Sequence, residues 1–223
     1  MNYLAHGYRF LDRPLFLAGT AVPDWLSVVN RRVRVRRRLV EPVVTGTPRP
    51  DVQQIGQGIL QHQADDDTFH RLPLFMQLES ELTTRFRAHM PDRFDHRPAF
   101  LGHIVVELML DAMLADADET LLDRFYHAMD QVRPEVVELA VNQMASRPTD
   151  RLAWFIQRFS EERFLYDYLD DVRMLRRINQ VLTRVRLPQL PAEIRSVLSG
   201  ARTIVYRHGP ELLQQVEASH ESS

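Results

Sequence analysis

Two short stretches of the sequence place histidines and acids at helical spacing. In "HQADDDTFH", His62, Asp66 and His70 follow one another at intervals of four residues. Residues four apart share one face of an α-helix and lie roughly 6 Å apart along its axis. A divalent ion binds imidazole nitrogen or carboxylate oxygen at about 2.0–2.2 Å, so such a pair can share one ion. If the helix continues to residue 70, the pattern predicts a metal site.

A second stripe of ionisable residues interrupts the most apolar stretch, "AFLGHIVVELMLDAMLA". His103, Glu107 and Asp111 again recur every four residues. A helix that is apolar on all sides is normally buried, and a buried carboxylate stays charged only when a cation or hydrogen-bond donors face it. We therefore predict that the two stripes face each other. Residues eight apart are separated by about 12 Å, so the use of all six requires two ions, or one ion and a layer that handles the substrate.

Two further residues of metal-ligating type lie near the start of the chain. His6 lies in the apolar "NYLAHGY" and Asp24 follows a proline in "GTAVPDW". We predict that both are metal ligands, with two alternatives: a hydrogen-bonded core histidine for His6, and a helix cap for Asp24. Without cysteine, only nitrogen and oxygen ligands are available. The predicted cofactor is thus one or two divalent ions, of manganese, iron, zinc or magnesium.

The elements that must position these residues are helices. Apolar residues recur at helical spacing, glycine is scarce, and alternation typical of strands is almost absent. Prolines such as Pro14, Pro23 and Pro98 are expected at helix boundaries, and "VEPVVTGTPRPD" is expected to be a surface loop. With 223 residues, of which 44% are hydrophobic, we predict one all-α domain over residues 1–217 and a disordered tail at 218–223.

Charge and composition limit the classes of partner. The net charge of -2 and a pI near 6.5 give no reason to expect non-specific binding to nucleic acid or membrane. The N-terminus lacks the pattern of a secretory signal, and the ionisable residues of the apolar stretch argue against a transmembrane span. We expect a cytoplasmic protein.

With these residues in view, the chain resembles the acyl carrier protein phosphodiesterases, a divergent branch of the HD-domain metal-dependent phosphohydrolases. The resemblance covers roughly the first half of the chain. It lies in "NYLAH", in "GTAVPD", in "HQADDDTFHRLP" and in the acids of "IVVELMLDAML". In three places the chain departs from the family pattern: His70 replaces an aspartate, Glu107 replaces an aspartate, and Ala112 stands where the family has histidine.

The resemblance implies an HD-like helical bundle and metal-dependent hydrolysis of a phosphodiester or phosphomonoester. It implies that Asp66 is a bridging or terminal metal ligand, with His6, Asp24, His62, Glu107 and Asp111 completing the shell. His70 or His103 would then donate a proton to the leaving group. Because Ala112 replaces the family's histidine, the alternative is a catalytically degenerate domain that binds an acidic partner or ligand without turnover.

An arginine-rich run, "NRRVRVRRR", follows the segment that contains Asp24. We predict that it is exposed and that Arg31, Arg32 and Arg36 attract a phosphate-containing substrate or an acidic carrier protein. No aromatic residues alternate with these arginines, which argues against binding of single-stranded nucleic acid.

The acidic residues also have interpretations that involve no metal ion. Glu107 and Asp111 could pair with buried arginines in place of a metal ion. Asp65 and Asp67 are expected to be solvated neighbours of Asp66, because three successive acids point in different directions around a helix.

Overall fold

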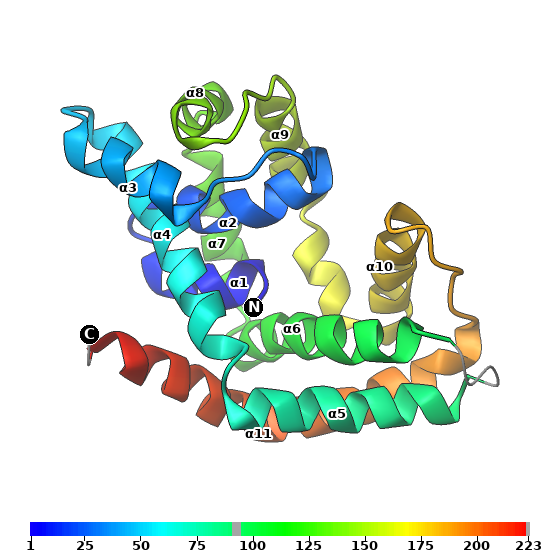
Figure 1. Cartoon of the computed structure of the whole chain (residues 1–223). Helices are drawn as coiled ribbons and strands as arrows, with labels where there is room; N and C mark the ends of the chain where they lie inside the picture. Colours follow the sequence, from blue (N-terminus) through cyan, green and yellow to red (C-terminus); the bar gives the residue numbers. More distant parts are fainter. Residues whose placement is uncertain (91–94, 222–223) are drawn as a thin grey trace. The chain divides into compact units, whose positions relative to one another are not determined.

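The chain folds into helices, as the spacing of its apolar residues predicts (Figure 1). The computed structural model describes residues 1–90 and 95–221, and these residues contain α-helices and short 3-10 helices without any strand. The all-α prediction is confirmed, whereas the likeness to an HD domain stays a prediction.

Contacts along the chain divide it into two compact units, and we name each after the helix that contributes the most buried residues to it. The α2 unit comprises residues 2–67 and 120–163, and the α6 unit comprises Met1 with residues 68–119 and 164–221. The α2 unit holds α1 (Tyr3–Gly7), η1 (Tyr8–Phe10), α2 (Pro14–Val29), α3 (Arg37–Gly46), most of α4 (Pro50–Phe69), α7 (Leu121–Asp130), α8 (Pro134–Met144) and α9 (Leu152–Glu162). The α6 unit holds α5 (Pro73–Ala88), α6 (Arg97–Ala117), η2 (Phe164–Leu169), α10 (Asp171–Arg184), η3 (Ala192–Ile194) and α11 (Arg195–Glu221).

Helix α2 forms the core of the first unit. It contacts α1, α7, α8 and α9, and most of its side chains from Phe16 to Leu26 are buried. This burial follows from its composition, because apolar residues occupy nearly every side of the helix. The helix also continues through Pro23, which we had expected at a boundary; a proline inside a helix removes the hydrogen bond to the carbonyl four residues earlier, here Gly19.

A pair of glycines brings the backbones of α2 and α4 together. A Cβ atom added at Gly58 would overlap the carbonyl oxygen of Phe16 and would lie 2.8 Å from the Cα atom of Gly19. Only glycine, whose side chain is a single hydrogen atom, fits at this crossing. Any larger residue must push the two helices apart. This close approach places the second half of α4 beside the helix that carries Thr20.

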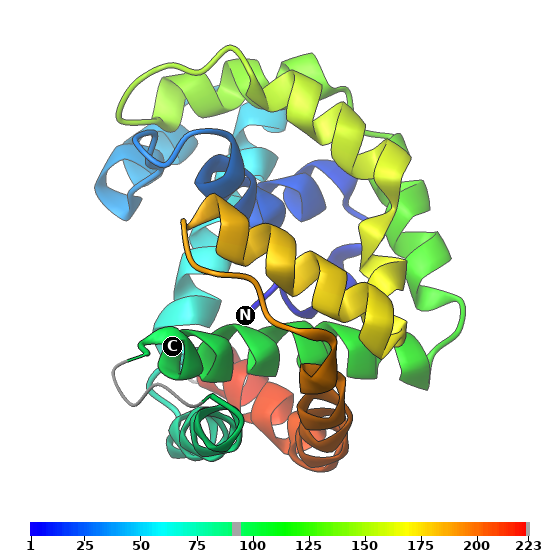
Figure 2. The same cartoon turned by 90° about the vertical axis from the view of Figure 1, so that its right-hand side faces the viewer.

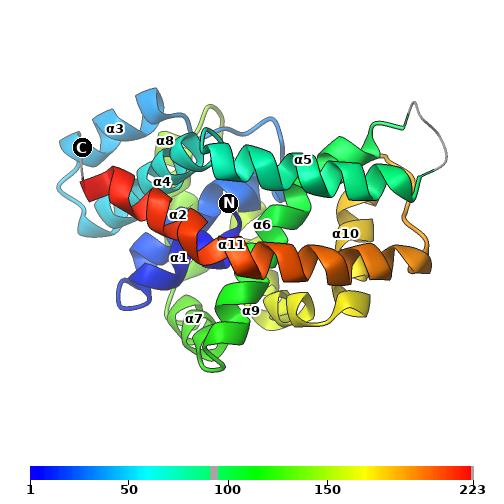
Figure 3. The same cartoon turned by 90° about the horizontal axis from the view of Figure 1, so that it is seen from below.

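In the α6 unit, the long apolar helix is packed against α5 and α11. Figure 3 shows α5 and α11 side by side, and Figure 2 shows η2 and α10 in yellow and gold. Helix α6 is the one helix among the described residues with the length and apolar composition to cross a membrane, and 67% of its most apolar window is buried. A core helix passes the same test, and the burial that we predicted for this stretch is present.

Two local predictions were wrong. The expected loop from Val40 to Asp51 contains α3, which runs through Pro42 to Gly46 with Val40 buried. Residues 218–221 of the expected disordered tail belong to α11, and residues 222–223 lie outside the described part.

The glycine pair leads to a stability prediction. We expect Gly58→Ala to lower the free energy of unfolding by about 1–3 kcal/mol, because the new methyl group meets backbone atoms that cannot rotate away. Urea denaturation followed by circular dichroism measures the change. Gly46→Ala in α3 is the matched control, since no atom lies within 4 Å of its added Cβ. An equal effect of the two substitutions would contradict the close approach.

Candidate metal centres

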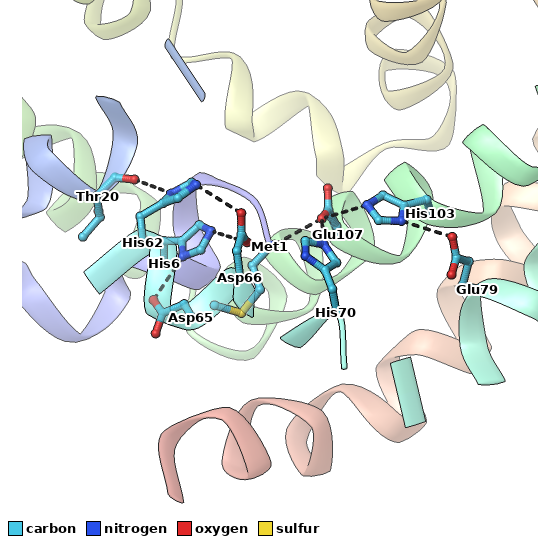
Figure 4. A network of polar contacts seen from close by, with 10 residues as sticks. All are labelled: Met1, His6, Thr20, His62, Asp65, Asp66, His70, Glu79, His103 and Glu107. Carbon is cyan, nitrogen blue, oxygen red and sulfur yellow. Dashed lines mark hydrogen bonds and ion pairs between the residues drawn. The ribbon is translucent and has the colours of Figure 1, made fainter. Parts of the chain in front are cut away.

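The α2 unit brings together His6, His62 and Asp66. His6 lies in the short helix α1, and the other two lie one turn apart in α4. The Nε2 atom of His6 is 3.3 Å from Oδ1 of Asp66, and Nε2 of His62 is 3.2 Å from Oδ2 (Figure 4). Ligand atoms bound to one divalent ion at octahedral or tetrahedral angles are about 2.8–3.6 Å apart. The separation of each histidine from Asp66 is therefore compatible with a shared ion.

The other ring nitrogen of each histidine has its own partner. Nδ1 of His62 is 2.8 Å from the carbonyl oxygen of Thr20, and Nδ1 of His6 is 3.1 Å from Oδ2 of Asp65. A carbonyl can only accept a hydrogen bond, so Nδ1 of His62 carries the hydrogen, and the carboxylate of Asp65 favours the same tautomer in His6. In their neutral forms, both rings thus direct an unprotonated Nε2 at Asp66. The rings are stacked, with centroids 3.9 Å apart.

Asp66 is negatively charged in this arrangement. Burial alone would raise the pKa of its carboxyl group, but positive charge and the facing ring nitrogens of His6 and His62 bring that pKa well below its usual range. Its side chain is still 32% exposed, whereas the side chain of His6 is fully buried. Asp66 is therefore the residue of the group that solvent reaches.

Asp65 was wrongly predicted to be a solvated neighbour. It is fully buried, accepts hydrogen bonds from His6 and Gln61, and lies 3.8 Å from the guanidinium of Arg9. The signal was present in the sequence, because Asp65 is three residues after His62 and four before the buried Phe69, and so shares their face of α4. Asp67 is exposed, as expected.

The α6 unit gathers a second group, formed by His70, His103 and Glu107. His70 follows the last residue of α4, and the other two lie one turn apart in α6. Nε2 of His70 is 3.1 Å from Oε1 of Glu107, and Nε2 of His103 is 3.5 Å from the same oxygen (Figure 4). Nδ1 of His103 is 3.1 Å from Oε1 of Glu79 in α5. In each of the two groups, one ligand atom from each of the three residues lies within 4.8 Å of the other two.

Charges around Glu107 shift the pKa values of this group. Burial raises the pKa of Glu107, but the amino group of Met1, 3.1 Å away, and hydrogen bonds from His103 and His70 bring the pKa below its usual range. The hydrogen bond to Glu107 raises the pKa of His103 against the opposing effect of burial, and Glu79 adds to the rise. The partners of Glu107 are thus nitrogen atoms of Met1 and two histidines, rather than the arginine considered above.

The remaining predicted ligands belong to neither group. Asp24 lies half-buried inside α2, so it does not begin a helix and the alternative of a cap is wrong. Asp111 is 1% exposed in α6, one turn after Glu107. Because α4 ends at Phe69, the stripe predicted through residue 70 is divided: two of its members belong to the first group and His70 to the second.

The arginine-rich run is exposed, as predicted. Arg31, Arg32 and Arg36 are exposed, while Val33 and Val35 are buried. The carbonyl of Val35 accepts a hydrogen bond from Gln63, which follows His62 in α4. The run is therefore attached to the helix that supplies two members of the first group.

Comparisons of the chain with protein-family models, with curated proteins and with solved structures gave no match.

The pKa of His103 provides a test of the second group. In metal-free protein we expect His103 to keep its proton to a higher pH than an ordinary histidine, whose pKa is about 6.5. The stability that this proton contributes is complete below the pKa of the unfolded chain and is lost as pH rises through the higher folded value. An NMR titration of the histidine rings measures the pKa directly.

Substitution identifies the cause of this shift. Glu107→Gln is expected to lower the pKa of His103, and Glu79→Gln to lower it by a smaller amount. Glu81→Gln is the matched control, because Glu81 is an exposed α5 residue paired with Arg85. A pKa of His103 unchanged by Glu107→Gln would contradict the geometry.

Proposed function

We propose that the protein is a metal-dependent hydrolase of phosphoric esters, with a divalent ion bound by His6, His62 and Asp66. Three protein ligands of nitrogen and oxygen type, with a position left for water or substrate, are the usual set of a catalytic zinc site. The partial exposure of Asp66 keeps this set accessible from solvent.

One observation carries the proposal: two stacked imidazoles direct Nε2 at one carboxylate while their Nδ1 atoms have acceptors of their own. Histidines that bind metal almost always donate their other N–H to a carboxylate or a backbone carbonyl. Asp65 and the carbonyl of Thr20 are these two kinds of acceptor. Without an ion, both rings would have to be protonated to donate to Asp66, and two imidazolium rings 3.9 Å apart repel each other. The donor set therefore fits a divalent ion.

A bound divalent ion would lower the pKa of a water molecule and neutralise charge that develops on phosphoryl oxygens. The protein's own contribution is positioning. Asp65 orients His6, Thr20 orients His62, and the charge of Arg9 compensates the buried carboxylate of Asp65. The stacked rings leave each imidazole little freedom to turn.

The choice of a phosphoric ester is supported by the sequence resemblance and by charge. His6, His62 and Asp66 are residues for which the resemblance implies a ligand role, and these three side chains lie together. Exposed Arg31, Arg32 and Arg36 supply positive charge that can attract a phosphate group or an acidic carrier protein. The proton-donor role of His70 or His103 stays a prediction, and another role for these residues is argued below.

Removal of the central carboxylate tests the proposal. We expect the purified protein to bind a divalent ion, and Asp66→Asn to reduce turnover of bis(p-nitrophenyl) phosphate and p-nitrophenyl phosphate at least about 100-fold, because it removes a charged ligand. Asp65→Asn, which changes the acceptor of His6 Nδ1 and leaves the three ligands in place, should weaken metal binding about 10–100-fold. Elemental analysis identifies the metal, and phosphatase assays with that metal measure turnover.

Asp67→Asn is the matched control, an exposed aspartate next to Asp66 in the same helix. If Asp66→Asn leaves metal binding unchanged, the proposed metal site at His6, His62 and Asp66 is rejected. Metal binding without turnover of either ester would reject hydrolysis and favour the degenerate binding domain. Iron(II) with oxygen-dependent chemistry would also reject hydrolysis, since two histidines and one carboxylate also hold iron in oxygenases.

The arginine run is tested through the dependence of the rate on salt. We expect the triple variant Arg31→Gln, Arg32→Gln, Arg36→Gln to lower kcat/KM for a polyanionic phosphoester substrate severalfold at about 10 mM salt. The loss should vanish at about 1 M salt, where the Debye length is about 3 Å. A loss that persists at high salt would show that the arginines do not act by long-range attraction.

A further inference from the structure

We propose that the α6 unit binds a divalent cation of its own through His70, His103 and Glu107. The inference does not depend on the proposed hydrolase activity, because these residues belong to the other unit. The resemblance implies ligand roles for other histidines and treats these two as proton donors. The site would take a borderline ion such as zinc, manganese or iron(II), because two of its three ligands are imidazoles.

The side chains of His70, His103 and Glu107 bring three ligand atoms together. The amino group of Met1 lies 3.1 Å from Oε1 of Glu107, and a bound ion would displace it. Both Nε2 atoms approach the same oxygen, at 3.1 and 3.5 Å. These separations lie within the range of about 2.8–3.6 Å expected for two ligand atoms on one ion. The rings are nearly parallel, with centroids 4.9 Å apart and an interplanar angle of 20°, so both Nε2 atoms face the same carboxylate.

The ligands are held in place before any ion arrives. Nδ1 of His103 is directed at the carboxylate of Glu79, which is the pairing that orients histidines at metal sites. Phe75 is buried and meets His70 and His103 edge-on, with centroids 5.2 and 5.3 Å away. A rigid aromatic residue thus holds both rings, and little conformational entropy is lost when the ion binds.

The two histidines are partly accessible. The side chains of His70 and His103 are 34% and 36% exposed, whereas that of Glu107 is 18% exposed. Water and ions can therefore reach the two rings, while the carboxylate supplies its charge from a less polar environment. A bound ion would connect the turn after α4 to α6 and would thereby stabilise the unit.

Metal stoichiometry in the full chain tests the proposal. Protein stripped with a chelator is titrated with Zn²⁺ alone, and bound metal per chain is measured after removal of the excess. We expect two ions in the wild type, one in Glu107→Gln and one in Asp66→Asn. Thermal melting in Zn²⁺ gives a second readout, because an ion that binds only the folded state raises the melting temperature.

Further variants separate loss of a ligand from loss of the fold. His103→Ala removes a half-exposed ligand and should also leave one ion. Glu79→Gln should weaken the second ion about 10–100-fold. Glu81→Gln in the same helix should keep both ions. Circular dichroism of each variant establishes that it is folded.

The outcomes distinguish this proposal from the proposed function. One ion in the wild type, kept by Glu107→Gln and lost in Asp66→Asn, would overturn the second site and leave the first. One ion lost in Glu107→Gln and kept in Asp66→Asn would support the second site and overturn the first. If the wild type binds a single ion that is lost in both Glu107→Gln and Asp66→Asn, the two sites are not independent and the proposal of a second site is overturned. If the wild type binds no Zn²⁺, both proposals are overturned.

Discussion

Compensation of charge in poorly hydrated surroundings is the constraint on which both polar groups depend. A carboxylate removed from water either takes up a proton or needs cations and donors around it. Asp66 and Glu107 satisfy this requirement with imidazole nitrogens, and the pKa of each carboxyl group is held below its usual range. An imidazole that faces a carboxylate must itself carry a proton or share a cation. The same pairing that stabilises the acids therefore makes a divalent ion a suitable occupant.

The fold supplies the fixed partners that this chemistry needs. In the α2 unit, the glycine pair permits the close approach of α4 to α2, and the Thr20 carbonyl of α2 accepts a hydrogen bond from His62. In the α6 unit, Glu79 of α5 accepts one from His103, and Phe75 packs against both rings. Each group thus rests on neighbours that are already in place around it.

The two groups share a donor set but differ in their surroundings. In the first, the histidines are buried and the carboxylate is the more exposed member; in the second, the histidines are exposed and the carboxylate is the more buried member. In the first group, burial keeps water away from both rings. In the second group, the hydrogen bond to Glu107 raises the pKa of His103, so a proton and a metal ion would compete for this ring.

The sequence by itself determined the helical class, the burial of α6 and the residue types available for chemistry. Apolar residues at helical spacing can bury themselves only as helices, and a chain without cysteine has nitrogen and oxygen ligands alone. It also indicated His6, His62 and Asp66, because polar residues in apolar surroundings require partners. The burial of Asp65 could have been read from its place on the face of Phe69, but the simpler expectation of solvation was wrong.

Only the tertiary structure decided which of these residues lie together. Spacing along a helix predicted one stripe through His70, but α4 ends at Phe69 and His70 is grouped with His103 and Glu107. Pro23 did not end α2, and Asp24 therefore lies in the body of a helix instead of at its start. The physical reason is that periodicity specifies the face of a helix on which a residue lies, whereas the partner of that face depends on contacts between segments far apart in the chain.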